Sequence, residues 1–216
     1  MGRLVNQDRR EAARHERGLQ KAALREAARR AFLNEPYASI TLSGLAARAN
    51  VPDGTASMLL GTREELFFEL FADTVAAWLS AFATAVEAVD RPLDAEAMAR
   101  LLASTVAADE GLPRFVAVLP AAVESAGADP APLWRIATRL REHVERFQQL
   151  VAEHGDDGVA ARARTVPFYL LALLGGLVPV SRPIAGMATA LADLDLSQFG
   201  VDLETELAQL LAAVLR

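Results

Sequence analysis

Apolar residues recur at helical intervals along nearly the whole chain, and no segment alternates apolar and polar residues as a half-buried strand does. Apolar residue types make up 52% of the 216 residues, which is enough for a sizeable buried core. Turn signals at the stretches DRP, GADP, HGDDG and SRP separate most of the helical segments. The sequence therefore predicts an all-α protein.

The N-terminal part reads as three helices followed by a long fourth one, at residues 10–34, 41–49, 55–60 and 62–89. The stretch NVPDG forms a tight turn between the second and third helices, where Asp53 can cap the third. Gly61 ends that helix, and Thr62 and Glu65 have the spacing of a capping box that opens the fourth. The second and third helices, joined by a glycine-containing turn, predict a helix-turn-helix.

The rest of the chain is expected to form helices at residues 93–109, 113–125, 131–153, 159–178 and 201–215, with a short helix and a loop over 182–200. Pro167 lies inside one of these segments and is expected to kink it, which can open space between helices.

Charge is distributed unevenly along the chain. Residues 1–63 hold 11 Arg and Lys against 6 Asp and Glu, whereas residues 64–216 hold 11 against 22. The formal charges are therefore +5 and −11, which give the net charge of −6. A basic N-terminal part on an acidic remainder predicts an anionic partner at one end only.

Residues that carry catalysis or bind metals are scarce. The chain has no Cys, which excludes thiolate metal sites and Cys nucleophiles. Its 3 His residues are His15, His143 and His154. The last two lie ~16 Å apart if they share one helix, which is too far to share a metal. His143 borders an apolar stripe, where we expect a satisfied edge-of-core histidine rather than a metal ligand. We therefore expect no enzyme, no metal and no cofactor.

A set of residues between positions 22 and 70 follows a known pattern: Ala27, Ala28, Phe32, Pro36, Tyr37, Thr41, the stretch LAARANV at 45–51, Gly54, Thr55, Leu60 and the stretch REEL at 63–66. With these residues the chain resembles the TetR family of one-component helix-turn-helix transcriptional regulators. The resemblance implies an N-terminal three-helix DNA-binding head and a C-terminal helical ligand-binding and dimerisation domain. We expect a basic N-terminal arm at 1–20, the head at 21–66 and the second domain at 67–216.

The third helix departs from the family pattern. Asp53 stands where Lys is common, Ala56 replaces Leu, Ser57 replaces Tyr, and Leu59 replaces Tyr or His. The missing side chains contact phosphates and bases in the family, so affinity is expected to come from other parts of the head. The expected DNA contacts are Arg9, Arg10, Arg14, Arg17, Lys21, Thr41, Ser43, Arg48, Gly54, Thr55, Ser57, Met58 and Arg63, with Arg63 in the position of a phosphate-binding Lys.

Basic residues fall at helical intervals on one side of the first helix: Arg10, Arg14, Arg17, Lys21 and Arg25. Arg9 precedes them in an arm that is expected to be loose and able to reach the minor groove. The alternative is a solvated face of an amphipathic helix, which is the better interpretation for a basic stripe that has no helix-turn-helix beside it.

The family resemblance also implies a small organic effector and a homodimer. We expect the effector pocket among Leu102, Thr105, Phe115, Leu119, Trp134, Thr138, Phe147, Phe168 and Tyr169, with ordinary core as the alternative. We expect segments 159–178 and 201–215 of two chains to pack as a four-helix bundle, with burial inside one chain as the alternative.

These features predict a DNA-binding transcriptional regulator, a repressor that a small apolar effector releases from its double-stranded operator. The N-terminus is polar and rich in Arg, unlike a signal segment, so we expect a cytoplasmic protein. No membrane span is expected, because the longest nearly uncharged run, residues 165–181, is short and contains Pro and Gly. The alternative is a dimeric small-molecule or protein-binding module of the same fold whose head no longer binds DNA.

Overall fold

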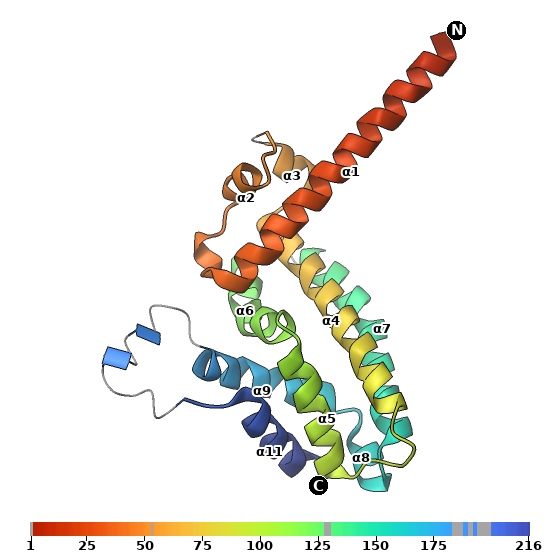
Figure 1. Cartoon of the computed structure of the whole chain (residues 1–216), viewed down its shortest axis with the longest axis vertical. Coiled ribbons are helices and arrows are strands. Elements are labelled where there is room, and N and C mark those ends of the chain that lie inside the picture. Colours follow the sequence, from red (N-terminus) through yellow and green to blue (C-terminus); the bar gives the residue numbers. More distant parts are fainter. Residues whose placement is uncertain (1, 53, 128–130, 183–187, 190–191, 194–199) are drawn as a thin grey trace. The chain divides into compact units, whose positions relative to one another are not determined.

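The protein is helical throughout the part of the chain that the structure describes. This computed structural model describes residues 2–52, 54–127, 131–182, 188–189, 192–193 and 200–216. Its elements are α1 (Gly2–Asn34), η1 (Tyr37–Ser39), α2 (Leu42–Arg48), α3 (Thr55–Leu60), α4 (Arg63–Glu87), α5 (Ala95–Ala108), α6 (Leu112–Ser125), α7 (Ala131–His154), α8 (Asp157–Arg162), α9 (Val166–Ser181) and α11 (Leu203–Leu215) (Figure 1). An isolated bridge joins Leu93 to Gly155, and no β-strand occurs within these ranges. The all-α prediction is confirmed.

The chain divides into two compact units, Met1–Leu70 and Phe71–Arg216, and the division falls inside α4. By length and hydropathy, α4 is the one described helix that could cross a membrane. However, 56% of its most apolar window is buried inside the protein, as is common for a core helix.

The first unit is a three-helix arrangement in which α1 packs against α2 and α3. Rings from α1, η1 and α4 meet at its centre. The Phe32 and Tyr37 ring centroids lie 5.9 Å apart, and Phe67 lies 5.2 Å from Phe32 and 5.6 Å from Tyr37. Aromatic pairs at these distances stabilise a core beyond the area that they bury.

Side-chain caps fix where the short helices of this unit begin and end. The hydroxyl of Thr41 accepts a hydrogen bond from Gly44 N at 3.1 Å and so caps α2. The predicted capping box of α4 is confirmed, because Thr62 N donates to Glu65 Oε2 at 2.8 Å and Glu65 N donates to Thr62 Oγ1 at 3.0 Å. Gly61 ends α3 with φ of 74°, and a Cβ there would meet Glu65 Oε2 at 2.0 Å. Asp53, the expected cap of α3, lies outside the described residues.

α1 begins at Gly2, so the segment that we expected to be a loose arm is helical. The reason is local: this segment is rich in Ala, Arg and Glu, which favour helices, and no Pro precedes Pro36. At 1.5 Å per residue the 33-residue helix is ~50 Å long. Residues 9–19 are all exposed, and the buried part of α1 begins at Leu24, so the N-terminal half projects beyond α2 and α3 (Figure 1).

In the second unit, α11 packs against α5 and α9, and α6 packs against α9. An aromatic cluster joins α4 to α7. The Trp78 ring lies 5.7 Å from Phe82 and 5.2 Å from Phe147, and the last two rings are 5.3 Å apart.

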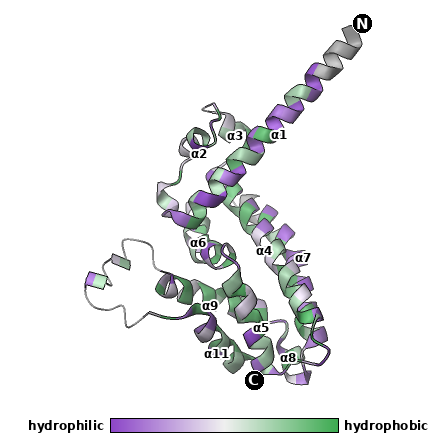
Figure 2. Cartoon of the chain, viewed as in Figure 1, coloured by the Kyte–Doolittle hydropathy of each residue, from purple (hydrophilic) through white to green (hydrophobic). Residues whose placement is uncertain are grey.

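The helix expected over 159–178 is two helices, because α8 ends at Arg162 and α9 begins at Val166. Pro167 lies in the first turn of α9, where its missing N–H removes no helical hydrogen bond. The predicted kink at Pro167 is therefore wrong. Figure 2 shows α9 as a largely hydrophobic helix. The expected short helix and loop over 182–200 lie mostly outside the described residues.

Candidate nucleic-acid interface and ligand cavity

The basic stripe of α1, which we define as Arg10, Arg14, Arg17 and Lys21, lies on the same side of the helix as the residues that α1 buries. All members of the stripe are exposed, and Arg17 Nε donates to Ala13 O at 3.1 Å. Their spacing of three and four residues continues without a break into the buried residues Leu24, Ala28 and Ala31. Because such a spacing keeps to one face of an α-helix, the exposed cations face the side on which the rest of the unit lies.

Arg25 and Arg9 do not belong to this exposed stripe. The Arg25 side chain is 24% exposed, and its Nη1 pairs with Glu69 Oε2 of α4 at 2.5 Å. Arg25 therefore joins α1 to α4 within the first unit. Arg9 is exposed but lies about 100° around the helix from Arg10.

The third helix of the head, α3, turns two side chains outward. Ala56 and Leu60 are buried, Thr55 is half-buried, and Ser57 and Met58 are exposed, the latter at 73%. The Ser57 hydroxyl donates to Gly54 O at 2.9 Å, and Gly54 itself has φ of 83°. α3 therefore offers a thioether and a hydroxyl to a base edge, but no charged or amide group.

The start of α2 carries two further expected contacts. Thr41 and Ser43 are exposed, and their hydroxyl oxygens lie 3.3 Å apart. Since the Thr41 oxygen already accepts from Gly44 N, its hydrogen remains for one further acceptor.

Arg48 was expected to supply charge to DNA, but it pairs inside the first unit. Its Nη1 and Nη2 bind both carboxylate oxygens of Glu35, the second at 2.9 Å. The hydrogen bond from Arg48 holds the pKa of the Glu35 carboxyl below its ordinary value. Glu35 thus offsets the charge that Arg48 would present to a phosphate.

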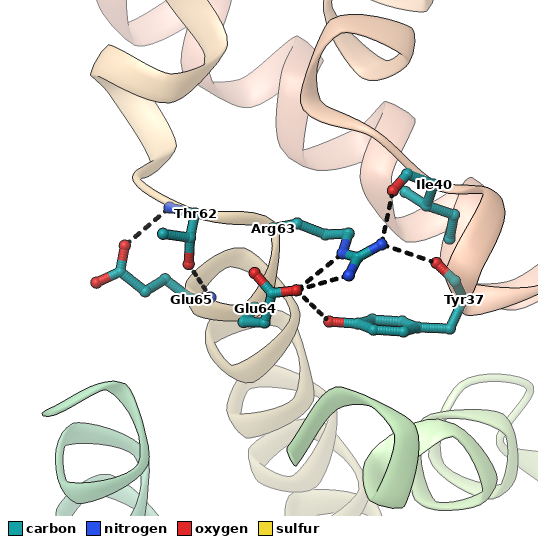
Figure 3. A network of polar contacts seen from close by, with 6 residues as sticks. All are labelled: Tyr37, Ile40, Thr62, Arg63, Glu64 and Glu65. Carbon is teal, nitrogen blue, oxygen red and sulfur yellow. Dashed lines mark hydrogen bonds and ion pairs between the residues drawn. The ribbon is translucent and has the colours of Figure 1, made fainter. Parts of the chain in front are cut away.

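Arg63 was expected to contact a phosphate, and its guanidinium instead lies among groups of the first unit (Figure 3). Nη1 donates to Ile40 O at 3.1 Å and to Tyr37 O at 3.3 Å. Nη2 and Nε donate to Glu64 Oε1 at 2.7 Å and 3.0 Å. The side chain is only 22% exposed, so Arg63 joins η1 to the first turn of α4.

Tyr37 completes this network from its other side. Its hydroxyl donates to Glu64 Oε1 at 3.3 Å. Burial, assisted by the negative charge of Glu64, raises the pKa of Tyr37 to about 12. The contacts of Arg63 with Tyr37 and Ile40 are long-range in sequence, so the REEL motif alone does not indicate them.

A cavity of about 190 Å³ lies within the second unit, between α4, α6, α7 and α9. Its walls are mainly aliphatic and aromatic, with Phe71 and Trp78 from α4 among them. Val144 and Leu171 line the cavity while remaining 38% and 42% exposed, so its mouth lies between α7 and α9. His143 also lines it.

The structure brings few of the expected pocket residues to this cavity. Leu119 and Phe147 line it. Leu102 and Phe115 are buried elsewhere in the core, and Thr105 accepts a hydrogen bond from Trp78 Nε1 at 3.3 Å.

The remaining expected pocket residues face solvent: Trp134 is 69% exposed, Phe168 68% and Tyr169 38%, and Thr138 is exposed. α9 turns Leu170 and Leu174 inward, which leaves its aromatic residues outside. The wall supplied by α4 was missed, although Phe71, Val75 and Trp78 recur there at helical spacing.

A larger groove of about 910 Å³ runs along α5 and α11 and is lined by both charged and apolar residues. Arg216 pairs with Glu96 at 2.9 Å across this groove, and Arg100 lies 4.0 Å from Glu96. The smaller cavity is more apolar than this groove, as small-molecule sites generally are.

An apolar face extends over the two C-terminal helices. Large apolar residues are exposed on α9 and α11: Phe168, Tyr169, Leu171, Val180 and Leu210. Between the α9 residues lie the exposed Ala172, Gly175 and Gly176, and a Cβ at either glycine would meet nothing within 4 Å. Small residues between large apolar ones allow close approach by another helix.

Comparison with known proteins gives similarities to a family model and to solved structures. A family model described as "Tetracyclin repressor-like, C-terminal domain" matches residues 72–216. The solved structure of the fatty acid degradation regulator FadR from Bacillus halodurans has a TM-score of 0.58 and 17% sequence identity, covering 91% of this chain and 96% of that one. At this identity, the second similarity indicates the fold alone. A search of curated proteins gave no match.

Proposed function

Because the chain belongs to the tetracycline repressor-like (TetR) family of transcriptional regulators, we propose that it is a homodimeric repressor whose first unit binds operator DNA. A small, largely apolar molecule that binds in the cavity of the second unit releases the repressor from the operator. This role places the protein in the cytoplasm.

The basic stripe of α1 is the observation that carries the DNA-binding part of the proposal. Four exposed cations, Arg10, Arg14, Arg17 and Lys21, lie on the side of α1 on which the helix-turn-helix packs. They span ~17 Å along the helix axis. A rigid stripe of this length suits several phosphates of one backbone, and neutralising them releases bound counterions.

We expect the exposed face of α3 and the start of α2 to make the contacts that distinguish one DNA sequence from another. Met58 suits contact with a thymine methyl group, and Ser57 and Ser43 can donate to phosphates or base edges. The described helix α3 carries no Arg, Lys, Asn or Gln, the side chains that form the usual bidentate pair with a base, and such a pair contributes ~1–3 kcal/mol of discrimination. We therefore expect tight binding with modest sequence preference.

The shared helix α4 supports release by a ligand in the cavity. Its N-terminal Arg63 and Glu64 hold the network of the first unit, and its Phe71, Val75 and Trp78 line the cavity. A ligand that repacks these cavity residues alters the helix on which the network depends. The population of the DNA-binding state then shifts by the difference in ligand affinity between the two states.

The exposed apolar face of α9 and α11 supports the homodimer. A two-fold axis through this face would pair the helices of two chains as a four-helix bundle. Two first units would then read half-sites ~34–36 Å apart, one turn of DNA.

A second candidate function is a dimeric ligand-binding or protein-binding module that no longer binds DNA. The uncharged α3 favours it, as do the internal partners of Arg48 and Arg63. The basic stripe favours the first candidate.

A gel shift separates the two candidates. We expect the protein to shift a duplex from upstream of its own gene at low salt, and the double variant Arg14→Gln, Lys21→Gln to shift it less. If the intact protein shifts neither this duplex nor a scrambled one at low salt, the second candidate replaces the first.

A further inference from the structure

The size of the cavity in the second unit limits what can bind in it. Its volume is about 190 Å³. Cavities for drug-sized ligands occupy ~300–1,000 Å³, whereas an engineered apolar cavity of ~150 Å³ in another protein binds benzene. The cavity therefore has room for a molecule of about one six-membered ring, and its Phe71, Trp78 and Phe147 walls favour an aromatic one.

His143 is the polar side chain that this cavity offers to a ligand. The indole of Trp78 is the other polar group among the lining residues, and its N–H already donates to Thr105. Within the described part of the chain, no hydrogen bond or ion pair engages the His143 side chain. No buried side-chain nitrogen or oxygen there lacks a partner, so the His143 ring nitrogens are accessible to solvent, and the half-buried His143 side chain is among the residues that line the cavity.

The charge of the residues that line the cavity limits the charge that a ligand can carry. Among the described residues that line the cavity, none is acidic, Lys or Arg. An ionised carboxylate would lose its hydration there with only an imidazole in return, which is costly. A neutral hydroxyl loses less, and an imidazole has both a donor and an acceptor nitrogen with which a hydroxyl can pair.

We propose that the cavity binds a neutral molecule the size of a single ring that carries one hydroxyl group, and that this hydroxyl pairs with the imidazole of His143. Its role as the effector rests on the proposed function, but its binding can be measured without DNA. His143 is then the residue that sets specificity, and the aromatic walls supply most of the affinity.

Isothermal titration of the full-length protein with phenol, toluene and benzoate tests the proposal. Phenol and toluene have similar size and differ in the hydroxyl, and benzoate carries a charge. In the wild type we expect phenol to bind more tightly than benzoate. The ratio of phenol to toluene affinity is expected to fall about 2- to 12-fold in His143→Leu, the range for one lost hydrogen bond.

Three further variants test whether the preference for phenol depends on His143 and whether the probes bind in the cavity. His143→Gln keeps a donor and an acceptor, and we expect it to retain part of the phenol preference. His154→Leu is the matched control, because this histidine ends the same helix ~16 Å away and does not line the cavity. Leu119→Trp fills the cavity, and we expect it to weaken both phenol and toluene. A thermal melt of each variant without probe checks that it is folded.

Three results would overturn the proposal: an unchanged phenol-to-toluene ratio in His143→Leu, tighter binding of benzoate than of phenol, or no binding of any probe to the folded wild type at millimolar concentration. The same probes are then added to the protein–DNA complex. A probe that binds as expected but leaves the complex intact supports this proposal and contradicts release by that ligand, so the two failures are distinguishable.

Discussion

The Arg63 guanidinium lies over the ring of Tyr37, with its Cζ 4.4 Å from the ring centroid. The same group donates to the Ile40 carbonyl, and the next residue, Thr41, caps α2. Arg63 therefore acts on the helix-turn-helix by holding the turn that precedes α2. In the family pattern this position indicates a phosphate contact, and the geometry assigns it a positioning role.

Replacement of Arg63 by Gln tests that role. We expect the first unit to lose ~2 kcal/mol of stability, because hydrogen bonds from a charged group and a cation–π contact are removed. Operator affinity should fall with it, but the slope of log K against log salt should stay unchanged, because no phosphate contact is lost. Thermal melting and anisotropy over a salt series measure the two quantities. A flatter slope with unchanged stability would instead indicate that Arg63 contacts a phosphate of the DNA.

The raised pKa of Tyr37 makes the stability of the first unit depend on pH in the alkaline range. Its pKa is raised to about 12, above the ordinary value near ~10. The folded state thus favours the neutral phenol side chain. This preference stabilises the first unit fully below pH ~10, and the stabilisation is lost as the pH rises through about 12. The chain has 2 Tyr, and absorbance titration should show one ionising late. Tyr37→Phe should remove this late step. A late step that persists in Tyr37→Phe would contradict the assignment.

The helical state of the N-terminal half of α1 can be tested at Gly18, which is exposed and whose added Cβ would meet nothing within 4 Å. Gly18→Ala should favour the helix by ~1 kcal/mol, and Gly18→Pro should oppose it by ~3 kcal/mol. Circular dichroism should therefore gain helical signal in the first variant and lose it in the second. The core of the first unit should stay folded, because its buried residues begin at Leu24. Equal spectra for both variants would mean that this segment is not helical.

Local signals in the sequence predicted the helices well, because caps and breakers act within a few residues. The capping box of Thr62 and Glu65 and the stop at Gly61 are examples. Partners from distant segments could not be predicted in this way: Glu35 engages Arg48, and the carbonyls of Tyr37 and Ile40 engage Arg63.

The cavity illustrates the same limit. The pocket residues on α7 and α9 were expected from their size and polarity and from the family resemblance, which do not indicate the face that each helix turns inward. Trp134 and Phe168 consequently lie in solvent, while Trp78 and His143 line the cavity. The N-terminal segment is helical and not the loose arm that we expected, because its residues favour helix.

The proposed dimer depends on the exposed face of α9, where Ala172 lies between larger apolar residues. A charged, bulky residue there would be buried without a partner in the interface. We expect light scattering at micromolar concentration to give a dimer for the wild type and a monomer for Ala172→Arg. Ala137→Arg, on an exposed position of α7, is the matched control and should remain dimeric. A dimer in all three proteins, or a monomeric wild type, would contradict the proposed interface.

The salt dependence of DNA binding tests the role of the basic stripe most directly. Fluorescence anisotropy is measured on an operator duplex and on a scrambled duplex for the wild type, for the double variant Arg14→Gln, Lys21→Gln, and for Arg30→Gln. Arg30 is the control, because it lies off the stripe and pairs with Glu26 at 2.8 Å. Each phosphate contact contributes a slope of about −0.9, so the double variant should flatten the slope by about 1.8 and weaken binding to both duplexes, while the control stays unchanged. An unchanged slope in the double variant, or no binding of the wild type to either duplex at low salt, would contradict DNA binding through the basic stripe.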